Sequence, residues 1–295
     1  MTSRHHRPEQ PAPVQLTTRD KNVLRAVYRH RFLTADQLHG LCFAGAGLRV
    51  CQARLRQLWA GSCLDRSYLP PETLGVRDRW SGVALYSLAL RGAGLLADDS
   101  NVDIDDIPHT PAQHRCSLDR MRHNLAATAF AVALELEAVR RGWTAMPTRE
   151  DELRARLWSL RQKRKLPPAL VPDGAVTLSG PAWQLPQTIL VEVARAGAKA
   201  GNNSIRRKVQ RYVAALRSGQ LRDLYGFAWI RAIVYLTPTV RRAANLARLV
   251  RDVAGADRTF RFGVCELPPG QSLALQPFLA PSGATLPLLP ELSIT

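Results

Sequence analysis

Two acidic residues in the second half of the chain lie where acidic residues are costly. Asp173 precedes the apolar run 175–178, and Glu192 lies inside the apolar run 189–193. Both runs are typical of buried strands. A carboxylate inside such a strand is unfavourable unless a partner binds it. Asp173 and Glu192 are therefore candidate ligands for one divalent cation, Mg²⁺ or Mn²⁺.

Two carboxylates on neighbouring strands, with a lysine nearby, are the groups that metal-dependent phosphodiester hydrolysis needs. The metal polarises the phosphate and activates water, while the lysine stabilises charge or positions the nucleophile. This is the outline of the PD-(D/E)xK nucleases, which place the lysine two residues after the second acidic residue. That position here is Ala194, so Lys208 or Lys199 would have to supply the amine. If the site is active, we expect its catalytic residues to be Asp173, Glu192 and Lys208.

A structural interpretation of the same residues stays open, in which Asp173 caps a turn and Glu192 pairs with an arginine. The surrounding pattern predicts an α/β domain over residues 112–266 with a mixed central sheet. Its helices are expected at 122–141, 150–160, 205–216 and 240–253, and its strands at 175–178, 189–193, 233–236 and 260–264.

The first hundred residues have the pattern of a winged helix. Capping boxes begin at Thr17 and Thr34, and a third helix is expected from Leu48 to Ala60. Two strand-like runs follow at 63–69 and 83–88, joined by a polar basic connection, and a short closing helix begins near Leu90. Three helices followed by two strands and a basic loop predict a winged-helix DNA-binding domain over residues 16–97.

The third predicted helix has two different sides. Its apolar residues cluster on one side, while Arg49, Gln52 and Arg56 cluster on the opposite side. Such side chains reach base edges and phosphates in a major groove. The alternative is an ordinary solvated face. The predicted DNA-binding residues are Arg49, Gln52 and Arg56, with Arg54 between the two sides as a phosphate contact and Arg77 and Arg79 in the basic loop.

The charge of the chain agrees with a polyanionic partner. Lys and Arg number 41 against 24 Asp and Glu, which gives a net charge of +17. We expect double-stranded DNA as the partner. The alternatives are that the excess of basic residues only keeps the protein soluble, or that it reflects a GC-rich genome. No stretch is apolar enough for a membrane span or a signal peptide, and the five cysteines form no CxxC pair. A cytoplasmic protein is the expectation.

Composition also divides the rest of the chain. Residues 1–15 are expected to be a disordered arm, residues 98–111 an acidic linker, and residues 267–295 a proline-rich tail. The predicted fold class is therefore an α+β winged helix followed by an α/β nuclease-like domain.

The order of these motifs resembles the replication-relaxation family of plasmids and integrative mobile elements, from Leu16 to about Leu236. The resemblance rests on Leu90-Arg91-Gly92-Ala93-Gly94-Leu95, Arg122-His123-Asn124, Pro172-Asp173-Gly174, Glu192-Val193-Ala194-Arg195, and Lys208 with Tyr212. It implies a winged helix fused to a nuclease-like domain, with a part in plasmid replication and DNA relaxation. The family commonly has an acidic residue where this chain has Ala194, which argues against an inherited catalytic or metal role.

The resulting hypothesis is a DNA-binding protein of a mobile element that acts in replication, DNA relaxation or transfer control. Its second domain is expected to be a degenerate nuclease that binds DNA or forms a homodimer. The alternatives are an active metal-dependent endonuclease that nicks DNA, and a transcriptional repressor.

Overall fold

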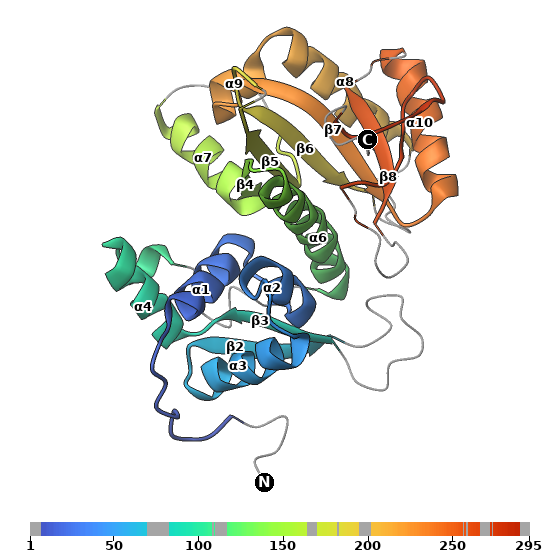
Figure 1. Cartoon of the computed structure of the whole chain (residues 1–295). Helices are drawn as coiled ribbons and strands as arrows, with labels where there is room; N and C mark the ends of the chain where they lie inside the picture. The colour runs from blue at the N-terminus through green and yellow to red at the C-terminus, as the bar shows by residue number, and fades with distance from the viewer. Residues whose placement is uncertain are drawn as a thin grey trace. The chain divides into compact units, whose positions relative to one another are not determined.

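The chain forms two compact units, Met1–Thr128 and Ala129–Thr295, whose boundary falls within the long helix α6 (Figure 1). The computed structural model describes residues 7–69, 83–107, 109, 117–163, 170–181, 183–194, 202–255, 257, 259–265, 272 and 274–289.

Unit 1 contains the helices and strands expected for residues 16–97, in the expected order, together with a short strand, β1, and a 3₁₀ turn, η2, that were not expected. In chain order they are α1 (Thr18–His30), β1 (Leu33–Thr34), α2 (Ala35–Cys42), α3 (Leu48–Ala60), β2 (Leu64–Leu69), β3 (Val83–Leu88), α4 (Leu90–Ser100) and the 3₁₀ turn η2 (Ile104–Asp106). The strands form an antiparallel sheet in the order β1-β3-β2. Both predicted capping boxes, at Thr17 and Thr34, are formed. Strand β1 was not predicted because two residues are too few to show a period.

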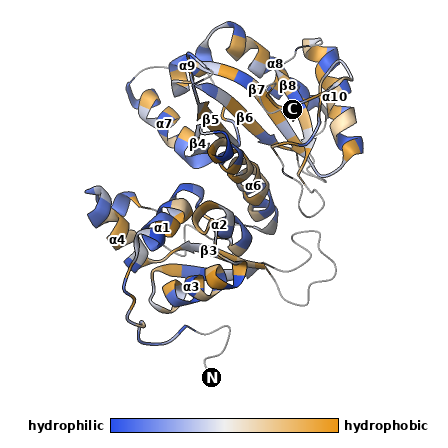
Figure 2. Ribbon diagram, viewed as in Figure 1, coloured by the Kyte–Doolittle hydropathy of each residue, from blue (hydrophilic) through white to orange (hydrophobic). Residues whose placement is uncertain are grey.

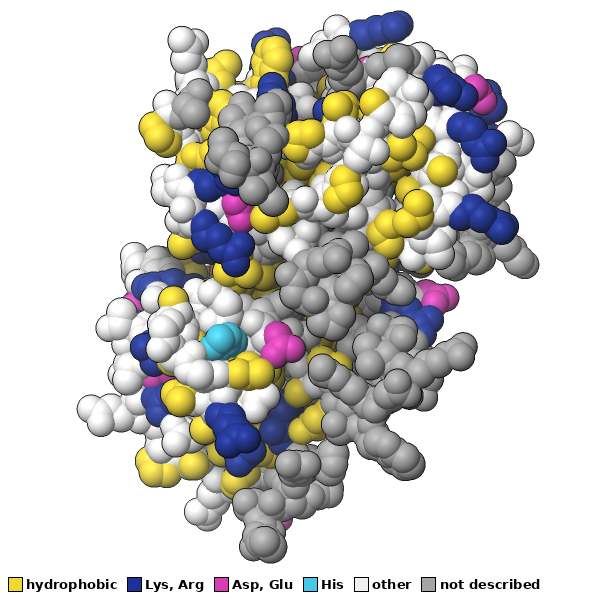
Figure 3. All heavy atoms as spheres, turned by 45° about the vertical axis from the view of Figure 1, so that its right-hand side comes forward, with side chains coloured by type: hydrophobic (Ala, Val, Ile, Leu, Met, Phe, Trp, Pro, Cys, Tyr) yellow, Lys and Arg dark blue, Asp and Glu magenta, His cyan; other side chains and the backbone are white. Residues whose placement is uncertain are grey.

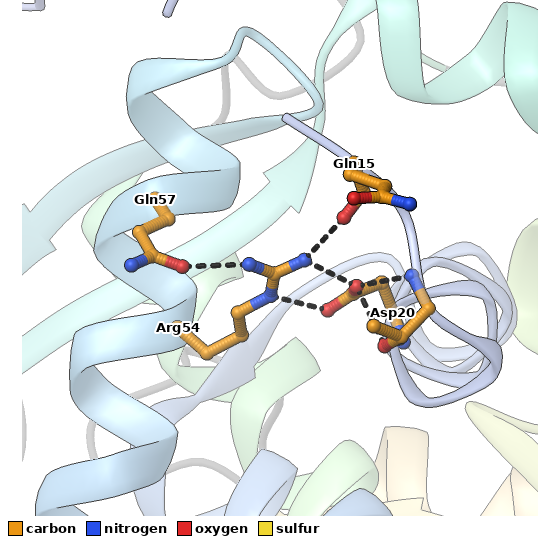
Figure 4. Close-up of polar contacts among 5 residues, drawn as sticks. Gln15, Asp20, Arg54 and Gln57 are labelled. Atoms are coloured by element: carbon orange, nitrogen blue, oxygen red, sulfur yellow. Dashed lines mark hydrogen bonds and ion pairs between the residues drawn. The ribbon is translucent and has the colours of Figure 1, made fainter. Parts of the chain in front are cut away.

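An ion pair between Asp20 of α1 and Arg54 of α3 connects two helices of this unit (Figure 4). The Asp20 side chain is fully buried. Arg54 Nε donates to Asp20 Oδ1 at 2.8 Å, and Arg54 Nη2 donates to Asp20 Oδ2 at 2.6 Å. Arg54 also donates to Gln57 Oε1 and to the carbonyl of Gln15. Burial by itself raises the pKa of Asp20, but hydrogen bonds from Arg54 and Thr17 outweigh it and keep the pKa below its ordinary value of 3.8.

Two segments of unit 1 differ from the expected arm and linker. Residues 7–15 pack on the unit: Ala12 N donates to Ala60 O at 3.1 Å, and Arg7 pairs with Asp65 at 2.8 Å. Residues 1–6 of the expected disordered arm lie outside the described residues. The expected acidic linker begins inside α4, because Asp99 accepts hydrogen bonds from Lys21 and Arg25 of α1 and the helix continues through it.

Helix α4 also explains one glycine of the motif at residues 90–95. A Cβ on Gly92 would lie 2.0 Å from the carbonyl oxygen of Cys63. Only glycine therefore allows α4 to begin this close to the residue before β2.

Unit 2 is built on the expected large mixed sheet. After α6 (Leu118–Arg140) come β4 (Thr144–Arg149), α7 (Glu150–Lys163), β5 (Gly174–Ser179), β6 (Gln187–Val193), α8 (Asn202–Arg217), α9 (Gln220–Tyr225), β7 (Trp229–Thr237), α10 (Val240–Ala254), β8 (Phe260–Val264), β9 (Phe278–Leu279) and β10 (Thr285–Leu286). The strand order is β10-β9-β8-β7-β6-β5-β4. The β6–β7 and β7–β8 pairs are parallel, and the other pairs are antiparallel.

One face of this sheet carries the main core of the unit. Helices α7 to α10 pack there, with Val209 of α8, Leu246 of α10 and Ile233 of β7 all fully or almost fully buried. In Figure 2 both α8 and α10 show orange and blue along their length, as expected for helices with one buried side and one solvated side.

Strand β4 and the end of the chain depart from the sequence-based expectation. β4 was not predicted, and it contains Pro147, which is tolerated because β4 lies at the edge of the sheet. The expected tail 267–295 contributes β9 and β10 to the sheet. Phe278 is fully buried there, and its ring centroid lies 6.3 Å from that of Phe130. Burial of this apolar side chain therefore holds the segment against the sheet.

Removing the Arg54 guanidinium tests how much unit 1 depends on the ion pair. Arg54→Ala leaves the buried Asp20 carboxylate without its charged partner, and we expect a loss of about 3 kcal/mol in the free energy of unfolding. Chemical denaturation at pH 7 measures the loss. The matched control is Arg56→Ala on the same helix, whose side chain is exposed and whose removal should change stability by less than about 0.5 kcal/mol.

The pH dependence gives a second measure of the same pair. Because the pKa of folded Asp20 is lowered, its contribution is fully present above 3.8 and is lost as the pH falls through the folded value. The stability difference between wild type and Arg54→Ala should therefore shrink in strong acid. Equal losses for Arg54→Ala and Arg56→Ala at pH 7 would contradict a structural role for this ion pair.

Candidate functional site

Three carboxylates follow one another across one end of the sheet in unit 2. Arg149 of β4 pairs with Gly174 of β5, which in turn pairs with Val191 of β6. A carboxylate residue adjoins each member of this row of paired residues: Glu150 follows Arg149, Asp173 precedes Gly174, and Glu192 follows Val191. The pairing of the three strands therefore brings these residues to the same end of the sheet. We call Glu150, Asp173 and Glu192 the carboxylate row.

The carboxylates of Asp173 and Glu150 lie close to each other. Each offers a carboxylate oxygen within 4.8 Å of the other. Asp173 is held by the backbone of β6, since its N donates to Val191 O at 3.0 Å and its Oδ2 accepts from Val193 N at 2.8 Å. Glu150 is the first residue of α7, and its Oε1 accepts from Arg154 Nε at 2.9 Å.

Glu192 is held by two side chains of α8. Tyr212 OH donates to Glu192 Oε1, and Lys208 Nζ donates to Glu192 Oε2. Glu192 is 3% exposed and Tyr212 is fully buried, whereas the Lys208 side chain retains 31% of its exposure. The structure thus brings Lys208 to Glu192, although Ala194 occupies the position where the motif has its lysine. The partner of Glu192 is this lysine, in place of the arginine considered in the structural interpretation.

The electrostatics of the row favour binding positive charge. Burial, with a further contribution from Asp173, raises the pKa of Glu192, while Lys208 and Tyr212 oppose this shift. Burial lowers the pKa of Lys208, but the charges of Glu192, Asp173 and Glu150 outweigh it and leave the pKa raised. Burial and Glu192 hold the pKa of Tyr212 well above its ordinary value. Lys208 therefore stays protonated, and Tyr212 stays a hydrogen-bond donor, at neutral pH.

The donor set of the row fits a hard divalent cation. Mg²⁺ and Mn²⁺ prefer carboxylate oxygens, which Asp173 and Glu150 supply within reach of each other. The predicted ligand pair is Asp173 with Glu192, whose two oxygens also accept hydrogen bonds from α8, and Glu150 is a further candidate ligand. Glu150 was missed because its place beside Asp173 depends on β4, whose polar, proline-containing sequence does not resemble a strand.

Helix α3 of unit 1 has the two sides expected from its sequence. Cys51, Leu55 and Leu58 are fully buried, while Arg49, Gln52 and Arg56 are exposed. Arg54 is instead engaged by Asp20, Gln57 and Gln15, so its guanidinium already holds the domain together. The predicted contacts Arg77 and Arg79 lie outside the described residues.

Comparison with solved structures gives a similar protein. The structure is similar to that of the restriction endonuclease FokI, with a TM-score of 0.27 and 14% identity over 84% of this chain and 41% of FokI. The chain thus spans about two fifths of that enzyme. No curated protein gives a significant match.

No helix in the described part of the chain has both the length and the apolar character needed to cross a membrane. The family model that matches is named Replication-relaxation, and it covers residues 24–228. The matched segment includes helix α3, the whole carboxylate row and Lys208. Because the match extends over more than half of the 295 residues, the chain belongs to the Replication-relaxation family.

Proposed function

We propose that this protein binds double-stranded DNA through unit 1, which forms a winged helix, and that it acts in plasmid replication or DNA relaxation. The observation that carries the proposal is the exposed set Arg49, Gln52 and Arg56 on one side of α3. The order α1-β1-α2-α3-β2-β3 supports a winged helix, in which the third helix enters the major groove. The family name supports the role in replication or relaxation.

The chemistry of α3 suits base and phosphate contacts. An arginine fork matches two acceptors of guanine or a phosphate, and a glutamine amide matches adenine. Helical spacing places Arg49, Gln52 and Arg56 on adjacent turns of one side, so they can follow one groove. The ion pair between Arg54 and buried Asp20 fixes α3 against α1 in the absence of DNA. It therefore holds Arg49, Gln52 and Arg56 in position for binding. Arg77 and Arg79 remain proposed contacts of the loop between β2 and β3.

Combined substitution of the exposed residues of α3 tests the DNA interface. Arg49→Ala, Gln52→Ala and Arg56→Ala together should weaken duplex binding by more than about tenfold, since each good base contact contributes about 1–3 kcal/mol. Fluorescence anisotropy with labelled duplexes, including DNA from the parent element, measures the dissociation constant.

The control for this experiment removes the same types of side chain from α1. Asn22→Ala, Arg25→Ala and Arg29→Ala together remove two arginines and one amide from exposed positions, as in the α3 variant. The control should bind within about twofold of wild type, because these residues lie on another helix. Unchanged affinity in the α3 variant would exclude α3 as the recognition helix.

A second candidate function, metal-dependent endonuclease, is favoured by one observation. Lys208 reaches Glu192 from α8, so the row has a lysine despite Ala194. Asp173 and Glu192, with Glu150 beside Asp173, would hold the cation, which when bound would polarise the scissile phosphate and activate water. Lys208, kept protonated by the row, would bind and orient the phosphate. Ala194 supports the opposite proposal, in which unit 2 is a degenerate nuclease that only binds DNA.

Cleavage of supercoiled plasmid distinguishes these proposals. If the endonuclease proposal holds, wild type nicks the plasmid with Mg²⁺ or Mn²⁺ and not with EDTA. Asp173→Asn preserves the shape of the side chain but removes a ligand charge, and it should slow nicking by at least about 100-fold, as expected when a group that supplies several kcal/mol of charge stabilisation is lost. Asp223→Asn, at an exposed position of α9, should nick like wild type. If wild type does not nick supercoiled DNA that carries the parent element, the endonuclease proposal fails. Unit 2 would then be a degenerate nuclease that only binds DNA.

A further inference from the structure

Helices α8 and α10 present arginines outward from the same face of the sheet in unit 2. The two helices are neighbours, and their inner residues, among them Val209 and Val250, join one core cluster. Among their exposed arginines are Arg206, Arg207 and Arg217 on α8 and Arg241, Arg248 and Arg251 on α10. We call these six residues the α8–α10 arginine surface.

The net positive charge per residue on these two helices is far above that of the chain as a whole. Helices α8 and α10 contain nine basic residues and a single acidic residue, Asp252, which gives a local charge of +8. The whole chain has a net charge of +17, so nearly half of it lies on two neighbouring helices. Figure 3 shows Lys and Arg side chains spaced along the part of unit 2 that comes forward from the right of Figure 1. Solubility alone does not require this concentration of one sign of charge.

The residue types point to phosphate groups as the ligand. Eight of the nine basic residues are arginines, whose planar fork binds phosphate through two hydrogen bonds. A membrane-binding helix would instead expose an apolar side to insert between lipids. Here Val209, Tyr212, Leu246 and Val250 are buried against the sheet, so that side is already occupied.

We propose that the α8–α10 arginine surface is a second nucleic-acid-binding surface, which holds the phosphate backbone of duplex DNA independently of helix α3. It rests on the proposed function, since DNA is the ligand in both. Helix α8 also carries Lys208, whose side chain is partly exposed and whose amine pairs with Glu192. A backbone bound along α8 would therefore have a phosphate beside the carboxylate row, whether or not that row cleaves it.

The test uses the full chain and labelled duplex DNA at several NaCl concentrations. Arg207→Ala, Arg241→Ala and Arg248→Ala together should raise the dissociation constant by about tenfold or more. They should also reduce the slope of log affinity against log salt by about 2–3, because each lost phosphate contact removes about 0.9 from it. The corresponding Arg→Lys variant keeps the charges and should retain most of the slope. Melting temperatures of both variants show that they remain folded.

A matched control removes three exposed arginines from other helices of the same unit. The control combines Arg156→Ala and Arg161→Ala on α7 with Arg222→Ala on α9. It lowers the net charge by the same amount as the α8–α10 variant. This control should bind within about twofold of wild type. Combining the α8–α10 variant with the α3 variant should multiply their separate effects, as expected for independent surfaces.

The outcomes separate this inference from the proposed function. If the α3 variant weakens binding but the α8–α10 variant has wild-type affinity and salt slope, the second surface does not exist while the winged-helix proposal stands. Equal weakening by the α7–α9 control would show that only total charge matters, which also overturns the inference. Competition by polyglutamate as strong as that by unlabelled DNA would assign the surface to acidic proteins instead. If wild type binds no duplex at low salt, both proposals fail.

Discussion

A buried carboxylate fixes the position of a basic helix in each unit. In unit 1 the carboxylate is Asp20, which receives Arg54 of α3. In unit 2 it is Glu192, which receives Lys208 and Tyr212 of α8. A buried carboxylate without partners is strongly unfavourable, so each helix is held at one rotation about its axis. Hydrophobic packing alone would restrict that rotation less, because apolar contacts are not directional.

The same arrangement separates structural cations from those that remain exposed. Arg54 is held by Asp20, whereas Arg49 and Arg56 on the same helix remain exposed. On α8, Lys208 pairs with Glu192 while Arg206 and Arg207 face solvent. Each helix therefore has one basic residue that orients it and others that are available to phosphates. Net charge alone does not distinguish these two roles.

Much of this organisation could be predicted from residue types and spacing. The two sides of α3 follow from helical periodicity, and the mixed sheet follows from the apolar runs and the helices between them. Family membership is confirmed by the match over residues 24–228. Asp173 and Glu192 could be selected because each adjoins or interrupts an apolar run, and Lys208 because it lies on the next helix.

The rest of the site depends on long-range pairing that leaves no local pattern. Glu150 reaches Asp173 only because β4 pairs with β5, and β4 shows no apolar alternation and contains Pro147. The ion pair of Arg54 with Asp20 could not be predicted, because these residues are 34 positions apart and only folding brings them together. The segment around Phe278 was expected to be a tail because prolines surround it and its strand is too short to show a pattern. In each case the deciding contact joins residues far apart in the chain.

Pro147 has a consequence for how unit 2 behaves in concentrated solution. β4 pairs with β5 without interruption from Thr144 to Arg149, so the missing N–H of Pro147 faces away from β5. An unprotected edge strand offers a continuous row of donors and acceptors to a strand of another molecule. At β4 that row lacks a donor in its middle, and at the opposite edge β10 is only two residues long. Both edges of the seven-stranded sheet thus offer few groups for pairing with a strand of another molecule.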